Sequence, residues 1–129
     1  MKKILLIMLS IMFVILSCKT PTTAIDSQRN GKYVSAKTVN GNSYLVFEYS
    51  NGGFDLYYSA NKDGSIAEGD KVNTVTETSI TGEDPNYTFQ TGVMAGSLQF
   101  LSDKVVKITV TFNEGPTTLN DILCYQTSN

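Results

Sequence analysis

The residue types in this chain that could do chemistry are few, because the sequence contains no histidine. This absence excludes Ser-His and Cys-His nucleophilic pairs and every metal site that needs an imidazole ligand. Among the 12 acidic residues, Glu48 and Asp55 flank the dipeptide Asn51-Gly52, and most of the others fall in expected turns. Nothing in this spacing indicates a cleft or a raised pKa, so we expect no catalytic carboxylate pair, no cofactor and no enzymatic activity.

The segment from Ser59 to Asp70 has some of the spacing of a calcium-binding loop. Asn61, Asp63 and the terminal Asp70 fall at offsets that oxygen ligands use, and Gly64 falls at the turn. Ser59 occupies the first ligand position, the last acid is not the longer Glu, and the flanks read as strands rather than helices. A solvated loop with a Lys-Asp-Gly turn explains the pattern better, and a metal site at Asn61, Asp63 and Asp70 is the weaker alternative.

The N-terminal residues have the pattern of a secretion signal. Lys2 and Lys3 give a positive start to an apolar run of 13 residues, Ile4 to Leu16. The apolar region of a signal peptide spans about 7 to 15 residues, whereas a transmembrane helix needs roughly 17 or more. We therefore expect residues 1–17 to be cleaved rather than to span the membrane.

The apolar run closes on Ile15-Leu16-Ser17-Cys18, which resembles the lipobox of bacterial lipoproteins. The resemblance implies cleavage between Ser17 and Cys18, with a diacylglyceryl group on the Cys18 thiol. Two or three acyl chains anchor a protein stably, whereas one chain binds only marginally. Lys19 is not the Asp that retains some lipoproteins in the inner membrane, so the resemblance favours a lipid anchor in the outer membrane of a bacterial cell envelope. An ordinary leader with an incidental cysteine is the alternative.

The chain behind the signal divides into a short polar stretch and one domain. Residues 18–30 contain one proline and several Thr and Ser, which predicts a flexible tether. Residues 31–129 are enough for a single core of modest size.

The charge of the mature chain argues against nucleic acid as a partner. Without Lys2 and Lys3, the 10 basic residues become 8 against 12 acidic ones, a net charge of −4. Such a chain lacks the attraction to phosphate that supplies most non-specific nucleic-acid affinity.

Beyond residue 30 the apolar residues recur with period two, interrupted roughly every 8 to 12 residues by Gly, Asn, Asp or Pro. This pattern is typical of β-sandwiches and β-barrels, and no window shows a helical stripe. We expect about eight strands, over residues 32–38, 43–50, 54–59, 72–81, 87–91, 97–101, 105–112 and 121–127.

The dipeptide Asn51-Gly52 is the strongest hairpin signal, because both central positions of such a turn need a positive φ. A two-residue turn here sets Tyr49 opposite Phe54. A loop one residue longer would set Tyr49 opposite Asp55, so the turn chemistry and the core pattern select the same register. The face that this register defines comprises Leu45, Phe47, Tyr49, Phe54, Leu56 and Tyr58.

A second hairpin is expected where Phe100 pairs with Val106 and Leu98 pairs with Ile108. This register requires a three-residue loop over residues 102–104. The alternate residues of its second strand, Lys107, Thr109 and Thr111, should then face solvent.

Successive strands joined by short turns favour an antiparallel meander, and about eight of them favour a small closed or nearly closed barrel, because closure removes exposed edges. A two-sheet β-sandwich is the alternative. Gly31-Lys32-Tyr33 resembles the Gly-x-Trp start of lipocalins and related barrels, which also favours the barrel. The chain has no Trp and no Arg near its C-terminus to stack on such a ring, so no binding residue is carried over from that family.

Two tyrosines are candidate contact residues. Tyr57 and Tyr58 are adjacent and therefore point to opposite faces of one strand. Tyr58 belongs to the apolar face, whereas Tyr57 and Tyr44 should point away from it. Tyrosine outside a core is typical of contact surfaces, so Tyr44 and Tyr57 could meet a ligand or a partner; ordinary cross-strand pairing is the alternative.

Cys124 is the only cysteine left once Cys18 is acylated, so no intramolecular disulfide can form. It alternates with Ile122 in the last expected strand, and no cationic neighbour in sequence lowers its pKa. We interpret it as a small buried apolar residue, with a reactive thiol or an intermolecular bridge as the alternative.

These observations indicate a non-enzymatic, lipid-anchored envelope lipoprotein whose small barrel binds a small apolar ligand or an envelope protein. The alternative is a structural, inhibitory or assembly-accessory lipoprotein without a ligand cavity. The barrel interior distinguishes them: if its own side chains fill it, nothing binds inside, whereas a pocket of several hundred cubic ångströms favours binding.

Overall fold

A computed structural model describes residues 24–66, 71–115 and 117–127 of the 129-residue chain. The expected signal peptide, the lipobox with Ser17 and Cys18, and Asp70 lie outside these residues. The described part is all-β, with two short 3-10 helices, η1 (Ser27–Arg29) and η2 (Glu77–Ser79). The strands are β1 (Gly31–Ser35), β2 (Tyr44–Ser50), β3 (Gly53–Ser59), β4 (Lys71–Val75), β5 (Ile80–Glu83), β6 (Asn86–Gln90), β7 (Met94–Ser102), β8 (Val105–Phe112) and β9 (Thr117–Gln126).

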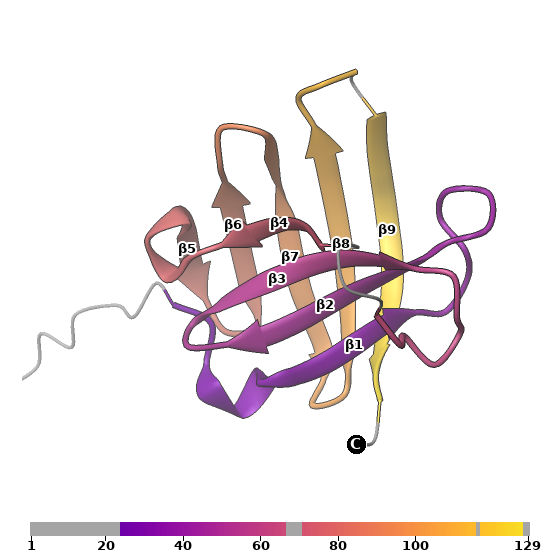
Figure 1. Cartoon of the computed structure of the whole chain (residues 1–129). Helices are drawn as coiled ribbons and strands as arrows, with labels where there is room; N and C mark the ends of the chain where they lie inside the picture. Colours follow the sequence, from indigo (N-terminus) through magenta and orange to yellow (C-terminus); the bar gives the residue numbers. More distant parts are fainter. Residues whose placement is uncertain (1–23, 67–70, 116, 128–129) are drawn as a thin grey trace, which may run out of the picture.

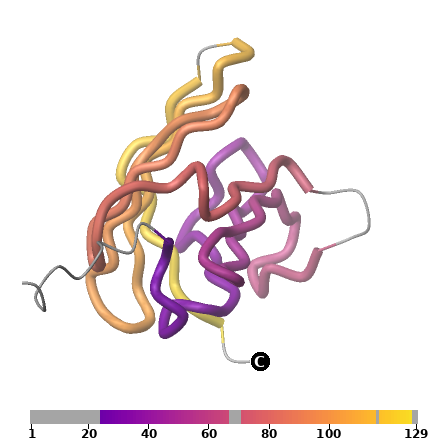
Figure 2. Tube along the Cα trace, turned by 90° about the vertical axis from the view of Figure 1, so that its left-hand side faces the viewer, coloured from indigo at the N-terminus to yellow at the C-terminus, as the bar shows by residue number. Residues whose placement is uncertain are grey.

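The nine strands form one continuous antiparallel sheet in the order β4-β3-β2-β1-β9-β8-β7-β6-β5. Pairing of β1 with β9 joins the first strand to the last, so the edges of the sheet are β4 and β5. Strands β1 to β4 cross β6 to β9 at a steep angle (Figure 1), and the two halves face each other as layers (Figure 2). The protein is therefore a nearly closed barrel built as a meander, as the sequence predicts, rather than a sandwich of two separate sheets.

The expected strand over residues 72–81 is two strands in the structure. Val75 and Ile80 are both buried in the core, yet they are an odd number of residues apart, which would place them on opposite faces of one continuous strand. A 3-10 turn at η2 separates β4 from β5 and returns Ile80 to the core. The structure therefore has one strand more than the eight expected, because the chain passes from one edge of the sheet to the other between β4 and β5.

The last strand also begins earlier than expected, at Thr117 rather than Asp121. Leu119 and Ile122 both pack against the core, and their odd separation requires a bulge between them. The register of β8 and β9 shifts at this point, and Asp121 has a φ of 50°. A period-two pattern cannot reveal a strand whose alternation is reset in the middle.

The hairpin between β2 and β3 confirms the predicted register. Ser50 pairs with Gly53 and Tyr49 with Phe54, and the two turn residues Asn51 and Gly52 have φ values of 51° and 77°. All six residues of the predicted face pack into or against the core.

The hairpin between β7 and β8 is predicted correctly in its strands and wrongly in its loop. Phe100 pairs with Val106 as expected, but Ser102 pairs with Val105, which leaves a two-residue turn. The register shifts between Phe100 and Ser102, so Leu101 is the additional, bulged residue, and it is 52% exposed. The bulge replaces the third loop residue that the prediction required.

One end of the barrel is closed by the segment that precedes β1. Ile25 is buried in the core, and its N–H donates to the carbonyl of Gly52 at 3.0 Å. Arg29 of η1 donates from Nε and Nη2 to the carboxylate of Asp84, both at 2.9 Å, and its guanidinium lies 4.8 Å from the ring centre of Phe100. The predicted tether therefore ends too late, because residues 24–30 pack on the barrel through one apolar side chain and one arginine. We call this end of the barrel the closed end.

All nine strands and the whole core cluster, from Ile25 to Cys124, lie within residues 24–127. The described strands and core residues of the barrel therefore all come from this part of the chain.

Candidate functional site

A pocket of about 450 Å³ lies at the end of the barrel opposite to Arg29, which we call the open end. The connections β1–β2, β6–β7 and β8–β9 contribute residues to its lining, together with the end of β3 and the start of β4. The lining residues are Val39, Asn40, Tyr58, Val72, Asn73, Val93, Phe112, Glu114, Gly115, Thr117 and Leu119.

Apolar side chains form the inner part of this pocket. Val39, Tyr58, Phe112 and Leu119 are partly buried and pack against the core. Tyr58 and Phe112 lie at or near the ends of β3 and β8, Leu119 lies beside the bulge of β9, and Val39 lies in the β1–β2 connection. Val72 and Val93, two of the valines that line the pocket, are 40% and 46% exposed.

Hydrogen bonds hold the loops around the pocket in place. The N–H of Val39 donates to the carbonyl of Ser43 at 2.8 Å, which ties the β1–β2 connection to itself. Asn113 joins the two other loops, since its N–H donates to the carbonyl of Val93 at 2.8 Å and its side-chain amide donates to the carbonyl of Gly92 at 3.1 Å. The apolar surface is therefore pre-formed rather than dependent on a rearrangement.

The polar groups of the pocket are almost all uncharged. Asn40, Asn73 and Thr117 offer amides and a hydroxyl. Among the described lining residues, Glu114 and the Tyr58 phenol are the ionisable groups. Burial raises the pKa of Tyr58 above its usual value, so its hydroxyl stays neutral at physiological pH. The pocket can hold an apolar group and present hydrogen bonds to its outer end, but it contains no nucleophile activated by a base.

The sequence analysis did not identify this pocket. Tyr58 was assigned to the apolar face and Phe112 to a strand. Val39 and Leu119 are isolated apolar residues in polar segments, and Val93 lies outside the expected strands. Isolated apolar residues have no periodicity, and only the topology brings them together.

The candidate contact residues Tyr44 and Tyr57 lie on the outer face of β2 and β3, as predicted, and both are half-buried. Neither lines the open-end pocket. The hydroxyl of Tyr57 donates to Asp55 Oδ2 at 3.4 Å. Val46, which pairs with Tyr57, is fully buried on this outer face.

Residues 60–66, which follow β3, cover part of that outer face. Val34 is buried there, and a Cβ added to Gly64 would come within 2.3 Å of it, so the segment packs closely on the sheet. Asp63 accepts a hydrogen bond from the N–H of Ser65 at 2.9 Å, and the Asn61 amide donates to the Ser65 hydroxyl at 2.8 Å. These side chains therefore stabilise a turn. Within residues 24–66, 71–115 and 117–127, no three His, Cys, Asp or Glu residues form a group that could hold a metal ion.

Glu48 and Asp55 are directly opposite each other in the β2–β3 register. Asp55 is 2.8 Å from Lys71 Nζ and accepts a hydrogen bond from the Thr74 hydroxyl. Burial raises the pKa of Asp55, but the hydrogen bonds from Lys71 and Thr74 outweigh it, so the net pKa lies below its usual value. A carboxylate held ionised in this way is suited to an ion pair rather than to proton donation.

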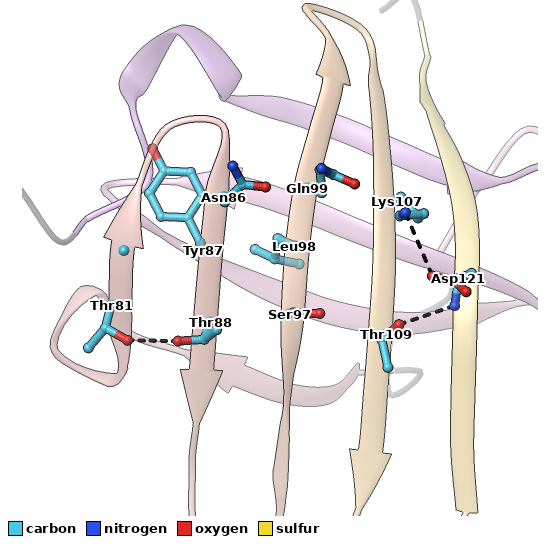
Figure 3. A pocket seen from close by; sticks show the side chains of 11 residues that line it. Thr81, Asn86, Tyr87, Thr88, Ser97, Leu98, Gln99, Lys107, Thr109 and Asp121 are labelled. Atoms are coloured by element: carbon cyan, nitrogen blue, oxygen red, sulfur yellow. Dashed lines mark hydrogen bonds and ion pairs between the residues drawn. The ribbon is translucent and has the colours of Figure 1, made fainter.

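A second hollow of about 370 Å³ lies over β5 to β9, and most of the residues that line it are of polar types (Figure 3). The hydroxyls of Thr81 and Thr88 are 2.7 Å apart, and Asp121 contacts both Lys107 and Thr109. A polar row of this kind is the usual solvent-exposed face of an antiparallel sheet.

Cys124 is fully buried, and burial raises the pKa of its thiol to about 12. This placement supports a packing role, because only the thiolate is reactive. Tyr49 is also buried in the core, and its hydroxyl has no hydrogen-bond partner within the described part of the chain.

Comparisons with protein-family models, with curated proteins and with solved structures found no match to this chain. Among the described residues, no helix has the length and the apolar character needed to cross a membrane. A functional proposal must therefore rest on the residues of the chain itself.

Proposed function

We propose that the chain is the precursor of a bacterial envelope lipoprotein, anchored by lipid on Cys18 in the outer membrane, whose barrel binds a small apolar ligand at its open end. The observation that carries the binding role is the apolar pocket of about 450 Å³ at the open end of a barrel whose remaining interior is packed with side chains. The lipobox pattern Ile15-Leu16-Ser17-Cys18 supports the anchor.

The size and composition of the pocket fit a small ligand. Ligand pockets commonly measure about 300 to 1,000 Å³ and combine an apolar lining with a few polar groups. Each square ångström of apolar surface that a ligand removes from water contributes about 25 cal/mol. An apolar side chain of an envelope protein would gain in the same way, so a protein partner is the second candidate.

The binding role is tested by native mass spectrometry of the mature chain, residues 18–129, recovered gently from the bacterial envelope. A retained small molecule supports the proposal, a stoichiometric protein supports the second candidate, and a bare chain contradicts both. Val93→Asp places a charge on the pocket lining and should abolish retention. Leu101→Asp is the matched control, since Leu101 is similarly exposed but lies at the β7–β8 bulge outside the pocket.

The anchor is tested by labelling cells with radioactive palmitate. The wild-type chain should incorporate label and sediment with the outer membrane, whereas Cys18→Ser should remain unlabelled and uncleaved. Equal labelling of the two chains would contradict the assignment of Cys18.

A further inference from the structure

The pocket at the open end has an uneven distribution of charge. Its apolar floor suits an alkyl or aryl group, while its polar side offers Asn40, Asn73 and Thr117 as neutral hydrogen-bonding partners. Glu114, an exposed residue beside the β8–β9 turn, adds one negative charge. Among the residues that the structure describes, the lining contains no Lys or Arg.

The nearest basic residues along the chain do not supply the missing cation. Lys71 directly precedes Val72, but its ammonium group is 2.8 Å from Asp55. The Asp55 carboxylate also accepts hydrogen bonds from Thr74 and Tyr57, so the cation is held in an outer-face network. Lys37 lines an adjoining hollow, which shares Val39 with the pocket and includes Ile122, but Lys37 itself is not among the described residues that line the pocket.

From this charge distribution, and resting on the proposed function, we infer that the pocket takes apolar ligands with an uncharged or cationic head group and rejects anionic ones such as fatty acids. A carboxylate head would have to leave water without a cation to receive it, and it would meet the like charge of Glu114. An ammonium head would be attracted to the same carboxylate, whereas a hydroxyl or amide head can use the neutral side chains.

Three ligands with the same eight-carbon chain isolate the effect of the head group. Isothermal titration calorimetry of residues 19–129 would compare 1-octanol, octylammonium and octanoate at pH 7 and low ionic strength. Octanol and octylammonium should bind, and octanoate should bind at least about fivefold more weakly, the effect of one like charge at a partly exposed site. Raising the salt concentration should reduce the difference in affinity between octanoate and the other two ligands, because salt screens exposed charges.

Two variants assign the selectivity to its source. Glu114→Gln should strengthen octanoate binding and weaken octylammonium binding, so the ratio of the two affinities should shift toward octanoate. Glu83→Gln removes the same charge from an exposed position in β5, outside the pocket, and should change none of the three affinities.

The outcomes separate this inference from the proposed function. Octanoate binding as tightly as octanol, or a preference unaffected by Glu114→Gln, would overturn the charge selectivity while leaving the apolar pocket in place. If none of the three ligands binds, the small-ligand function fails and the selectivity fails with it.

Discussion

The two ends of the barrel differ in how their apolar core residues are covered. At the closed end, Ile25 inserts into the core, and Arg29 lies on Phe100 while its nitrogens donate to Asp84 and to the carbonyl of Ser102. At the open end, no equivalent segment covers Tyr58, Phe112 and Leu119 among the described residues, and a pocket remains. We infer from this difference that the packing of the closed end contributes to stability, whereas the incomplete packing of the open end leaves apolar surface available for binding.

The largest difference between the ends should come from glycine substitutions. Gly52→Val at the closed end forces a β-branched residue to a φ of 77° and places its Cβ 2.8 Å from Ala24 Cβ. We expect a loss of about 3 kcal/mol of unfolding free energy, measured by urea denaturation. Gly41→Val also has a positive φ but free space around it, and should lose about 1 to 2 kcal/mol. Equal losses for the two variants would contradict the packing of residue 24 on the turn.

Removal of the arginine should have the next largest effect. Arg29→Met keeps part of the packing on Phe100 and removes the paired hydrogen bonds to Asp84, which are only partly exposed to solvent. We expect a loss of about 1 to 2 kcal/mol in the same urea experiment. A value near zero would show that the closed end does not depend on this ion pair.

A smaller, pH-dependent effect should accompany that ion pair. The hydrogen bond from Arg29 holds the pKa of Asp84 below its usual value near 3.8, against the opposing effect of burial. A lowered folded-state pKa stabilises the fold above about pH 4, and this contribution is lost as the pH falls through the lowered pKa. Between pH 7 and pH 3, the wild-type protein should therefore lose more stability than Asp84→Asn. Identical pH profiles would contradict the role of Asp84.

The smallest effect on stability is expected at the open end. Val93→Asp changes a side chain that is 46% exposed, so the free energy of unfolding measured in urea should stay within about 0.5 kcal/mol of wild type. Ligand binding should nevertheless be lost. A large destabilisation would show that the open end belongs to the structural core after all.

The sequence allowed the fold to be predicted wherever a local rule acts over consecutive residues. Asn51-Gly52 and the alternating residues of β2 and β3 define the register, since turn geometry and face pattern are both encoded within that hairpin. The rule fails at η2 and at the Asp121 bulge, where one backbone irregularity resets the alternation.

The pocket could not be predicted because its residues share no local pattern. Val39, Val93 and Leu119 come from three separate parts of the chain, and their proximity depends on closure of the sheet between β1 and β9. The ion pair between Arg29 and Asp84 could not be predicted for the same reason, since the two residues are 55 positions apart in sequence. The lipocalin pattern has its arginine near the C-terminus, whereas in this chain the arginine that lies on an aromatic ring precedes β1.

The position of Ala24 beside the Gly52 turn limits how the barrel can stand on a membrane. If lipid is attached at Cys18, the six steps of chain to Ala24 can span at most about 20 Å. Strand β9 runs from the open end to the closed end and, with 10 residues, is about 33 Å long. On the proposal that Cys18 carries lipid, this stretch of chain is shorter than the barrel, so the closed end would lie toward the bilayer and the pocket would open to the aqueous side. A ligand would then reach the pocket from solution rather than from the leaflet that carries the anchor.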